Sequence, residues 1–357
     1  MSLTTLAEDP VALTRALVDI ESVSGDELQI TDAVQAALLG ARHLTVQREG
    51  NVVRAFTNLN RPRRVILAGH LDTVPVNANL PSRMDGDRMY GCGTADMKSG
   101  AALALHLALT LPEPADDVTY LFYDCEELEA ERNGLNAIGR THPEWLEGDF
   151  AVLLEPTYGL VEAGCQGSIR VTVRVRGSRA HVARAWKGVN AIHGAGQLLV
   201  TLANYESRRP VIDGCEYREA LNAVRIRGGV AGNVVPDLCE IDINHRFAPD
   251  RTPAQAVAYL QELFAGYELE VIEVAPAAPP GLDAPPARDF VDAVGSAPVA
   301  KLGWTDVARF AERGVPALNF GPGDPNIAHH PDEHVEVGKI TEGAAVLRRW
   351  LGGGDRG

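Results

Sequence analysis

The chain has 357 residues, of which 45% are hydrophobic and 23% are charged, and its formal net charge at pH 7 is −15. This composition is typical of a globular protein with room for two hydrophobic cores, and the acidic balance argues against nucleic acid or an anionic membrane surface as a partner. The first residues lack the pattern of a signal peptide, and no apolar run approaches the roughly 20 residues of a membrane span. Five scattered cysteines form no CxxC pair, so we expect a cytoplasmic protein with reduced thiols.

The first 167 residues alternate between helix-like and strand-like segments. Apolar residues recur at helical spacing over 9–39, with a break at 22–27, and residues 96–111 and 127–140 also resemble helices. Short apolar runs at 63–69, 117–124 and 150–156 are typical of buried strands. Strands that alternate with helices predict an α/β layer with a mostly parallel sheet and helices on both faces.

The pattern changes near residue 168. Residues 168–177 alternate apolar and basic side chains, as half-exposed antiparallel strands do. Further strands are expected at 223–229, 238–247 and 267–274, helices at 191–208 and 252–266, and a proline-rich connector at 275–286. The mixed α/β pattern returns with a helix and strand over 309–324 and a last helix at 341–351. We therefore predict one α/β domain, residues 1–167 and 282–357, interrupted by an inserted α+β domain, residues 168–281.

Acidic and imidazole side chains follow three of the predicted strands in the first domain. They are His70 and Asp72 after the first, Asp124, Glu126 and Glu127 after the second, and Glu155 after the third, with Asp96 at a helix start between them. Ligands collect at the carboxyl ends of strands in open α/β sheets, and this set of side chains suits zinc, with manganese or cobalt tolerated. Without cations, so many carboxylates would repel one another and take up protons.

Each of these residues also has a plainer interpretation. Glu126 and Glu127 could form an acidic helix start, Asp96 a helix N-cap, and Glu155 a solvated strand end. Their joint occurrence at three strand ends in order favours a site for two divalent ions.

Seven segments carry a resemblance to a known family. They are GHLDTVP (69–75), YGCGTADMKSG (90–100), DCEELEAERNG (124–134), LLEPT (153–157), RAHVAR (179–184), GGVAGNVVPD (228–237) and AHHPDE (328–333). In this order they are similar to the co-catalytic zinc deacylase and exopeptidase family, which includes succinyl-diaminopimelate desuccinylase, acetylornithine deacetylase, aminoacylase and glutamate carboxypeptidase. The resemblance implies a zinc exopeptidase-like fold, amide hydrolysis, and a homodimer formed through the inserted domain.

The resemblance also implies the ligands of the two ions, Zn²⁺ with Co²⁺ or Mn²⁺ as alternatives. One ion is expected at His70, Asp96 and Glu155. The second is expected at Asp96, Glu127 and His329. His329 is preferred to its neighbour His330 because the family pattern places the histidine four residues before a glutamate, here Glu333.

Further roles follow from the same resemblance. Asp72 is expected to fix the tautomer of His70. Glu126 is expected to be the general base, and His181 to act in the partner subunit's active site on the scissile carbonyl. Asn233, Arg246 and Thr305 match positions that bind substrate.

Two segments depart from the desuccinylase pattern, which the chain otherwise resembles in its shorter form. GCQGS (164–168) lacks an arginine that would bind a carboxylate, and GWTD (303–306) replaces GGTSD. Arg174, Arg179 and Arg184 are candidates to compensate. The expected reaction is the release of succinate from N-succinyl-LL-2,6-diaminopimelate. The alternatives are an acetylornithine deacetylase, another N-acyl amino acid hydrolase or carboxypeptidase, and, more remotely, a non-catalytic binding member of the family.

Overall fold

The computed structural model describes residues 2–353, which form two compact units. Unit 1 contains residues up to Gly164 together with Pro280–Val299 and the chain from Thr305 onward. Unit 2 contains Cys165–Pro279 and Ala300–Trp304. These boundaries differ from the predicted 168–281 insertion by a few residues at each end and by the short return segment before Thr305.

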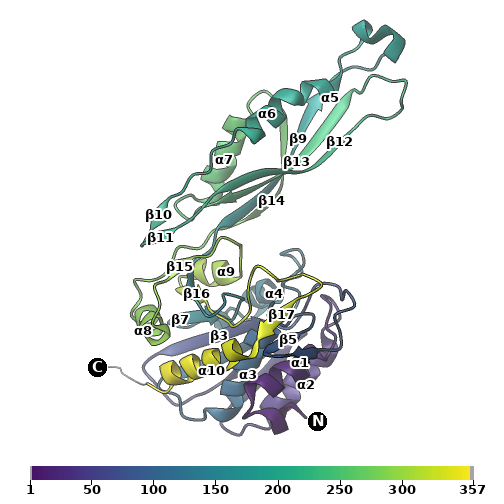
Figure 1. The fold of residues 1–357 in the computed structure, drawn as a ribbon. Coiled ribbons are helices and arrows are strands. Elements are labelled where there is room, and N and C mark those ends of the chain that lie inside the picture. The colour runs from purple at the N-terminus through teal and green to yellow at the C-terminus, as the bar shows by residue number, and fades with distance from the viewer. Residues whose placement is uncertain (1, 354–357) are drawn as a thin grey trace. The chain divides into compact units, whose positions relative to one another are not determined.

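Unit 1 contains the larger number of elements (Figure 1). Its α-helices and 3₁₀ helices (η) are η1 (Leu3–Leu6), α1 (Pro10–Val18), α2 (Leu28–Leu39), α3 (Lys98–Thr110), α4 (Gly134–Thr141), η2 (Pro143–Leu146), α8 (Pro285–Val294), α9 (Val307–Ala311) and α10 (Val337–Leu351). Its strands are β1 (Thr45–Glu49), β2 (Val52–Phe56), β3 (Arg64–His70), β4 (Arg83–Asp85), β5 (Arg88–Tyr90), β6 (Asp117–Tyr123), β7 (Phe150–Leu153), β8 (Glu162–Ala163), β15 (Val299–Ala300, at the unit boundary), β16 (Ala317–Asn319) and β17 (His334–Glu336).

The main sheet of unit 1 has the order β1-β2-β6-β3-β7-β16-β8-β15. Its four central strands, β6, β3, β7 and β16, are parallel, whereas β1 and β2 on one side and β8 on the other pair antiparallel. All seven residues of β6 and all four of β7 are buried, which explains their continuous apolar sequence. Because the central strands are parallel, the carboxyl ends of β3, β6 and β7 lie at the same edge.

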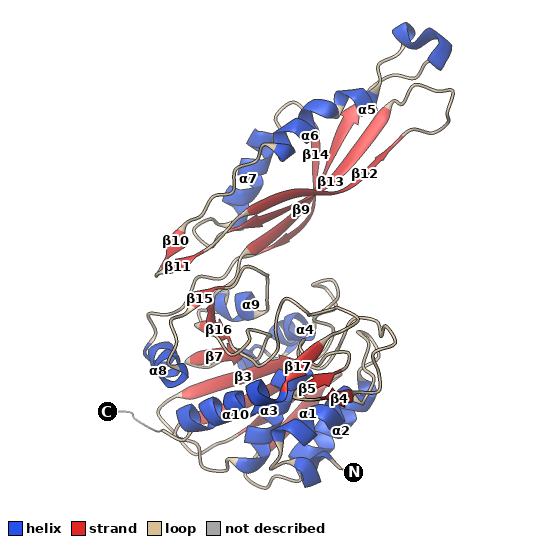
Figure 2. Ribbon diagram, in the orientation of Figure 1, coloured by secondary structure: helices blue, strands red, loops and turns tan. Residues whose placement is uncertain are grey.

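Helices flank this sheet (Figure 2). α3 is buried over nearly its whole circumference and contacts α1, α2 and α10, while α4 and α9 contact β2, β7 and β16. Close packing of α3 requires Gly100 in its first turn, because a Cβ there would lie 1.9 Å from the backbone oxygen of Leu154. The predicted class of fold, mixed α/β with a large sheet, is confirmed.

Two predicted helices are shorter than the sequence pattern indicates. The helix expected over 127–140 begins at Gly134, because the side chain of Asn133 caps it by accepting the N–H of Asn136. The helix expected over 191–208 is divided into α5 and α6 and ends at Ala203. Part of the expected connector is helical, because Pro285 and Pro286 open α8, where proline is tolerated.

Unit 2 is an α+β layer. Its elements are β9 (Gly167–Arg176), η3 (Val182–Lys187), α5 (Ala191–Gly194), α6 (Gly196–Ala203), β10 (Val211–Ile212), β11 (Cys215–Glu216), β12 (Ala220–Gly228), β13 (Leu238–Phe247), α7 (Pro253–Leu263) and β14 (Glu268–Ala275). The four-stranded antiparallel sheet has the order β12-β13-β9-β14. Buried and partly exposed residues alternate along β13, so one face of the sheet packs on the helices.

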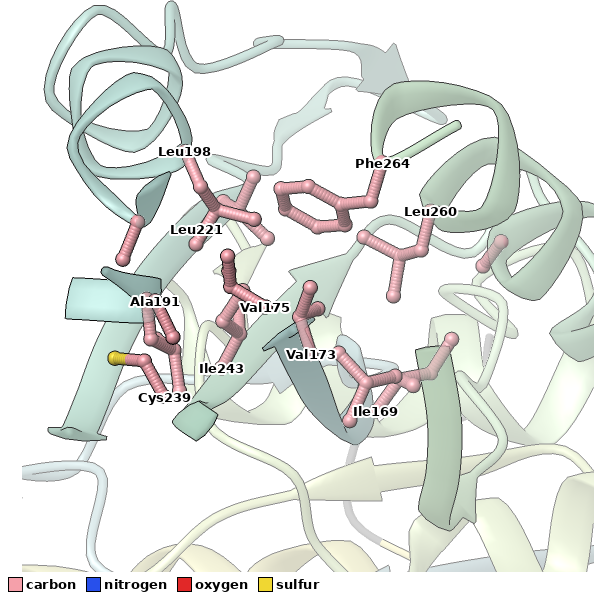
Figure 3. Packing of buried hydrophobic residues seen from close by; sticks show 14 of the residues in the cluster. Ile169, Val173, Val175, Ala191, Leu198, Leu221, Cys239, Ile243, Leu260 and Phe264 are labelled. Carbon is pink, nitrogen blue, oxygen red and sulfur yellow. The ribbon is translucent and has the colours of Figure 1, made fainter. Parts of the chain in front are cut away.

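The hydrophobic core of unit 2 lies between this sheet face and the helices (Figure 3). Ile169, Val173 and Ile243 from the strands meet Leu198 of α6 and Leu260 of α7. The opposite face carries paired charges: Arg174 lies 2.8 Å from Glu240 and 2.6 Å from Glu270, measured between nitrogen and carboxylate oxygen. This division explains the alternation of apolar and basic residues in the sequence.

Among the described residues, no helix is long and apolar enough to cross a membrane.

Candidate active site

His70 stands at the carboxyl end of β3 and is fully buried. Its Nδ1 lies 3.0 Å from the backbone oxygen of Asp72 and 3.4 Å from Oδ1 of the same residue, and its Nε2 lies 3.1 Å from Oδ1 of Asp96. Burial alone would lower the pKa of the imidazole, but the two carboxylates outweigh it and raise the pKa well above its ordinary value. The ring is thus held by Asp72 on one side while its other nitrogen faces Asp96.

The buried carboxylate of Asp72 also organises the loop after β6. Its Oδ1 accepts the N–H of Glu126 at 3.1 Å, and its Oδ2 accepts the N–H of Glu127 at 3.1 Å and the hydroxyl of Ser24 at 2.7 Å. Burial alone would raise the pKa of Asp72, but His70 and these donors lower it. An ionised Asp72 therefore fixes the backbone of Glu126 and Glu127. Asp72 does not engage their side-chain carboxylates, which can take part in binding or catalysis.

Asp96, Glu127 and His329 meet at one place. Nε2 of His329 lies 2.7 Å from Oε1 of Glu127 and 3.5 Å from Oδ2 of Asp96, and these carboxylates raise the pKa of His329 to about 10. One ligand atom from each of His70, Asp96 and Glu127 lies within 4.8 Å of the others, as in a site that could hold a metal ion. His70, Asp96, Glu127 and His329 come from segments far apart in the sequence.

The structure distinguishes the two neighbouring histidines. The ring of His330 accepts the N–H of Asp332 at 3.2 Å, whereas the ring of His329 faces the two carboxylates. His329 has φ of 64° and Cys125, just before the glutamate pair, has φ of 53°. Both lie in the left-handed region, which disfavours non-glycine residues and is frequent at functional sites.

Glu126 and Glu155 complete the acidic group. Glu155 follows β7 and is 4% exposed. Burial raises the pKa of Glu126 well above its ordinary value, and the charges of Glu155, Asp306 and Glu127 act in the same direction, whereas His70 opposes them. A carboxyl group with a raised pKa is suited to general acid–base catalysis.

Two buried glutamates, Glu27 and Glu333, support these loops, and no pattern in the sequence indicates this role. Glu333 accepts the N–H groups of Gly93, Ala95 and Asp96. Glu27 accepts the N–H groups of Gly25 and Cys125 and the thiol of Cys125. From the sequence, Glu27 is simply an acidic residue before a predicted helix. Glu333 is used only to choose His329 over His330 as the expected ligand.

The predicted substrate-binding residue Thr305 is 4% exposed, and its hydroxyl donates to Oδ1 of Asn319 at 2.8 Å. Asn319 in turn donates to the backbone oxygens of Glu162 and Gly164. Thr305 therefore helps to hold the strand β16, and its contact with substrate stays a prediction.

Unit 2 contains the other three predicted residues, His181, Asn233 and Arg246. The segments of His181 and Asn233 are adjacent, because the N–H of Val182 donates to the backbone oxygen of Asn233 at 3.1 Å and His181 forms a β-bridge with Val234. Arg246 stands near the other end of β13, eight residues beyond Leu238, which corresponds to roughly 26 Å along a strand. Within one unit 2, Arg246 is therefore remote from the other two.

Two of the arginines that were expected to compensate for the one missing from GCQGS already bind acidic side chains within unit 2. Arg174 bonds to three glutamates, and Nε of Arg179 lies 2.8 Å from Oδ2 of Asp237. By contrast, the partly buried guanidinium of Arg246 has no ion pair or hydrogen bond among the described residues, and burial lowers its pKa. Arg174 and Arg179 are thus poorly placed to compensate for the arginine missing from the GCQGS segment.

With this geometry in place, comparison with known proteins identifies the family. The profile of peptidase family M20/M25/M40 matches residues 66–352. The chain belongs to this family. It is 54% identical over 351 residues to a Mycobacterium tuberculosis protein assigned as the succinyl-diaminopimelate desuccinylase DapE, covering 98% of this chain and 99% of that protein.

Other members of the M20 family show the same relationship. The Corynebacterium glutamicum succinyl-diaminopimelate desuccinylase is 47% identical over 357 residues, covering 97% of each chain. The acetylornithine deacetylase of Shigella sonnei is 32% identical over 297 residues, covering 76% of each chain. The family predicted from the seven motifs is therefore confirmed.

Solved structures of M20 peptidases share the fold. Aminopeptidase PepT from Bacillus cereus has a TM-score of 0.78 at 20% identity, covering 97% of this chain and 98% of that one. The YXEP protein of Bacillus subtilis, described as a dinuclear metal binding peptidase, has a TM-score of 0.70 at 17% identity, covering 97% and 98%. Family membership and the His70–Asp96–Glu127 group together make this M20 protein a hydrolase that uses divalent metal ions.

Proposed function

We propose that the protein hydrolyses N-succinyl-LL-2,6-diaminopimelate to succinate and LL-2,6-diaminopimelate, a step in the biosynthesis of lysine and of cell-wall precursors. The observation that carries the proposal is the 54% identity, over nearly the full length, to the M. tuberculosis protein assigned to this reaction. The convergence of His70, Asp96 and Glu127 at the carboxyl edge of the sheet supports a metal-dependent mechanism.

The residues fit two divalent ions, with Zn²⁺ as the proposed metal. His70, Asp96 and Glu155 would hold one ion, and Asp96, Glu127 and His329 would hold the other. Imidazole and carboxylate groups are the ligands of catalytic zinc. Burial, and in addition the negative charges of neighbouring carboxylates, raise the pKa of Glu126, and bound cations would offset that accumulation of negative charge. Divalent ions bound in such a site lower the pKa of water toward neutrality and polarise a carbonyl oxygen.

Glu126 would supply the proton transfers of the reaction. Its backbone is fixed by Asp72, so its carboxylate can take the proton of the attacking water and return it to the leaving amine. Asp72 also keeps the ring of His70 in one orientation by accepting from its Nδ1. His181 would donate a hydrogen bond to the oxyanion that develops on the scissile carbonyl.

A homodimer through unit 2 is part of the proposal. β12 is an edge strand that is exposed over most of its length and presents Val224 and Ile226, and exposed edges of this kind pair readily with a second chain. The separation of Arg246 from His181 and Asn233 within one unit 2 is consistent with a site to which two subunits contribute different residues. The five cysteines are all buried and unbridged, which supports action in the cytoplasm.

Arg246 is the proposed partner of the substrate's succinyl carboxylate. Its guanidinium is half-buried and forms no ion pair among the described residues, whereas Arg170, Arg174 and Arg227 of the same sheet are paired with acidic side chains. Gln166, in the GCQGS segment, is 1% exposed, and its Nε2 has no hydrogen-bond partner among the described residues. Ser168, two residues after Gln166, pairs with Arg246 in the sheet.

The nearest alternative is hydrolysis of N-acetylornithine, which the 32% identity to an acetylornithine deacetylase supports more weakly. Metal content and the rates on both substrates should be measured with purified, Zn²⁺-loaded protein. We expect two ions per chain and a kcat/KM for the succinyl substrate well above that for N-acetylornithine. A preference for N-acetylornithine would overturn the proposed substrate, and turnover of neither would overturn the enzymatic proposal for these compounds.

The contribution of Arg246 can be tested in the same assay. Arg246→Gln should raise KM for the succinyl substrate, because a charge-assisted bond to its carboxylate is lost, and should affect N-acetyl substrates much less. Arg227→Gln, which removes a paired arginine from the same sheet, is the control. Equal effects of the two substitutions would remove Arg246 from the substrate site.

A further inference from the structure

The loop that carries His329 is joined to the loop that carries Asp96 by one buried side chain. Glu333, four residues after His329, is 2% exposed. Its Oε2 accepts the N–H of Gly93 at 3.0 Å, and its Oε1 accepts the N–H groups of Ala95 at 2.8 Å and Asp96 at 3.0 Å. The backbone oxygen of Glu333 also accepts the N–H of Gly91 at 3.1 Å.

This arrangement matters because the local bonds of the loop at 91–96, from the N–H and the hydroxyl of Thr94 to the backbone oxygen of Gly91, do not include Asp96. Gly91 and Gly93 interrupt it, and Gly93 has φ of 81°. Three of its N–H groups end on the two oxygens of one carboxylate, and only a carboxylate can accept from all of them without offering a competing donor. In a buried place these bonds gain strength, since water does not compete for them.

The two joined loops contribute side chains to the same place. Nε2 of His329 lies 3.5 Å from Oδ2 of Asp96, although the two residues are more than 200 positions apart in the sequence. Glu333 is not one of the proposed metal ligands, because both of its carboxylate oxygens already accept hydrogen bonds from backbone N–H groups. Its carboxylate therefore acts on the position of Asp96 relative to His329.

We propose that Glu333 is a positioning residue that fixes Asp96 against His329 and thereby sets the affinity of the metal position that Asp96, Glu127 and His329 would share. This inference rests on the proposed two-ion site and goes beyond it, because it assigns metal affinity to a side chain that binds no metal. The chemical class concerned is a divalent cation with imidazole and carboxylate ligands.

The chain offers a matched control at the other end of the same sheet. Asp117 begins β6, is 4% exposed, and accepts the N–H groups of Leu59 and Arg61 and the hydroxyl of Thr57. Like Glu333 it accepts three hydrogen bonds, although one of them comes from a hydroxyl and Nη2 of Arg64 lies 3.8 Å from its Oδ2. It stands at the amino end of the parallel strand, away from the carboxyl edge where the site lies. A purely structural role would make the two carboxylates equivalent.

The test is a Zn²⁺ titration of metal-free full-length protein in competition with a fluorescent chelator. The variants are Glu333→Gln, Asp117→Asn and His329→Gln. We expect Glu333→Gln to weaken one of the two Zn²⁺ sites by about 10–100-fold, the range for loss of a side chain that supports a ligand, and Asp117→Asn to leave both affinities within about twofold of the wild type. In Glu333→Gln/His329→Gln the loss should not exceed that of His329→Gln alone, since both act on the same site.

Other results overturn the inference. Wild-type affinities in folded Glu333→Gln, or equal losses in Glu333→Gln and Asp117→Asn, would reduce Glu333 to a structural residue. If Glu333→Gln does not fold, Glu333→Asp, which keeps the charge and shortens the side chain, is titrated in its place against the same two outcomes. A wild-type protein that binds fewer than two ions would instead contradict the proposed function, so the two failures are distinguishable.

Discussion

The sheet of unit 2 and the loops at the carboxyl edge of unit 1 are built in opposite ways. Unit 2 has regular alternation along long strands, with an apolar face on the helices and arginine–glutamate pairs on the other face. The loops of unit 1 are irregular, and buried carboxylates hold them by accepting backbone N–H groups from distant segments. The sheet of unit 2 is thus stabilised by a repeated pattern of side chains. The loops of unit 1 are held in place by single hydrogen bonds between residues far apart in the sequence.

The largest expected effect lies in the loop after β6. Glu126→Gln keeps the size of the side chain but removes the proposed base, so kcat should fall by about 10²–10⁴-fold while the Zn²⁺ content stays at the wild-type level. Glu129→Gln, at an exposed position of the same loop, is the control and should retain full activity. Steady-state kinetics with metal analysis measure both, and a near-wild-type rate in Glu126→Gln would assign the base elsewhere.

The two neighbouring histidines provide the next test. His329→Gln should lower the affinity for one Zn²⁺ by at least the roughly 10–100-fold that loss of a supporting partner causes, because the ring that meets Asp96 and Glu127 is gone. His330→Gln should bind both ions normally, since its ring accepts only a local N–H. If a chelator competition shows weaker Zn²⁺ binding in His330→Gln than in His329→Gln, His330 is the ligand instead.

The contrast between the two regions also decides how much the sequence could predict. The alternation over 168–177 predicted β9, which the structure places at Gly167–Arg176, because each residue's environment follows from its neighbours. The segment 127–140 has helical spacing, yet α4 begins only at Gly134. Asp72 holds the N–H of Glu127 from 55 positions away, and no local pattern contains that bond.

Part of the candidate site could also be proposed from local patterns in the sequence. His70, Asp96 and Glu127 could be proposed because each follows a strand or opens a helix, and parallel strands bring their ends together. Glu27 and Glu333 could not be recognised, because an acidic residue that accepts backbone N–H groups carries no sequence signature of its partners. Only the folded chain shows that Gly93 and Glu333, 240 positions apart, are bonded.

In unit 2 the expected effect is on stability. Ile243→Ala empties part of the core between β13 and the helices and should reduce the free energy of unfolding of unit 2 by about 2–5 kcal/mol. Zn²⁺ affinity should not change, because Ile243 belongs to the core of unit 2 and all of the proposed ligands belong to unit 1. Arg174→Gln, on the charged face of the same sheet, should have a clearly smaller effect that declines further with added salt. Thermal unfolding at two salt concentrations checks both, and similar losses would contradict the assignment of the two faces.

The smallest effect is expected at Asp117, and it depends on pH. Burial alone would raise the pKa of Asp117, but the donors from Leu59, Arg61 and Thr57 lower it below the ordinary value of 3.8. Its stabilisation is therefore complete above about pH 4 and is lost as the pH falls through the lowered pKa. Asp117→Asn should lower the free energy of unfolding by about 1–3 kcal/mol at pH 7, and the difference from the wild type should shrink below pH 4. Urea unfolding at pH 7 and pH 3 measures this, and a difference that is independent of pH would be inconsistent with an ionised Asp117.

The contact between Gly100 and the backbone oxygen of Leu154 has a consequence for how this site can vary. Glu155 follows Leu154 directly, so the depth to which α3 settles onto β7 determines where that carboxylate stands. A single methyl group added at position 100 would push Leu154 away from α3 and would displace Glu155, although none of the proposed ligands is itself substituted. The position of the proposed ligand thus restrains which residues this apolar helix can carry, and a homologue with any side chain at position 100 would have to change the end of β7 as well.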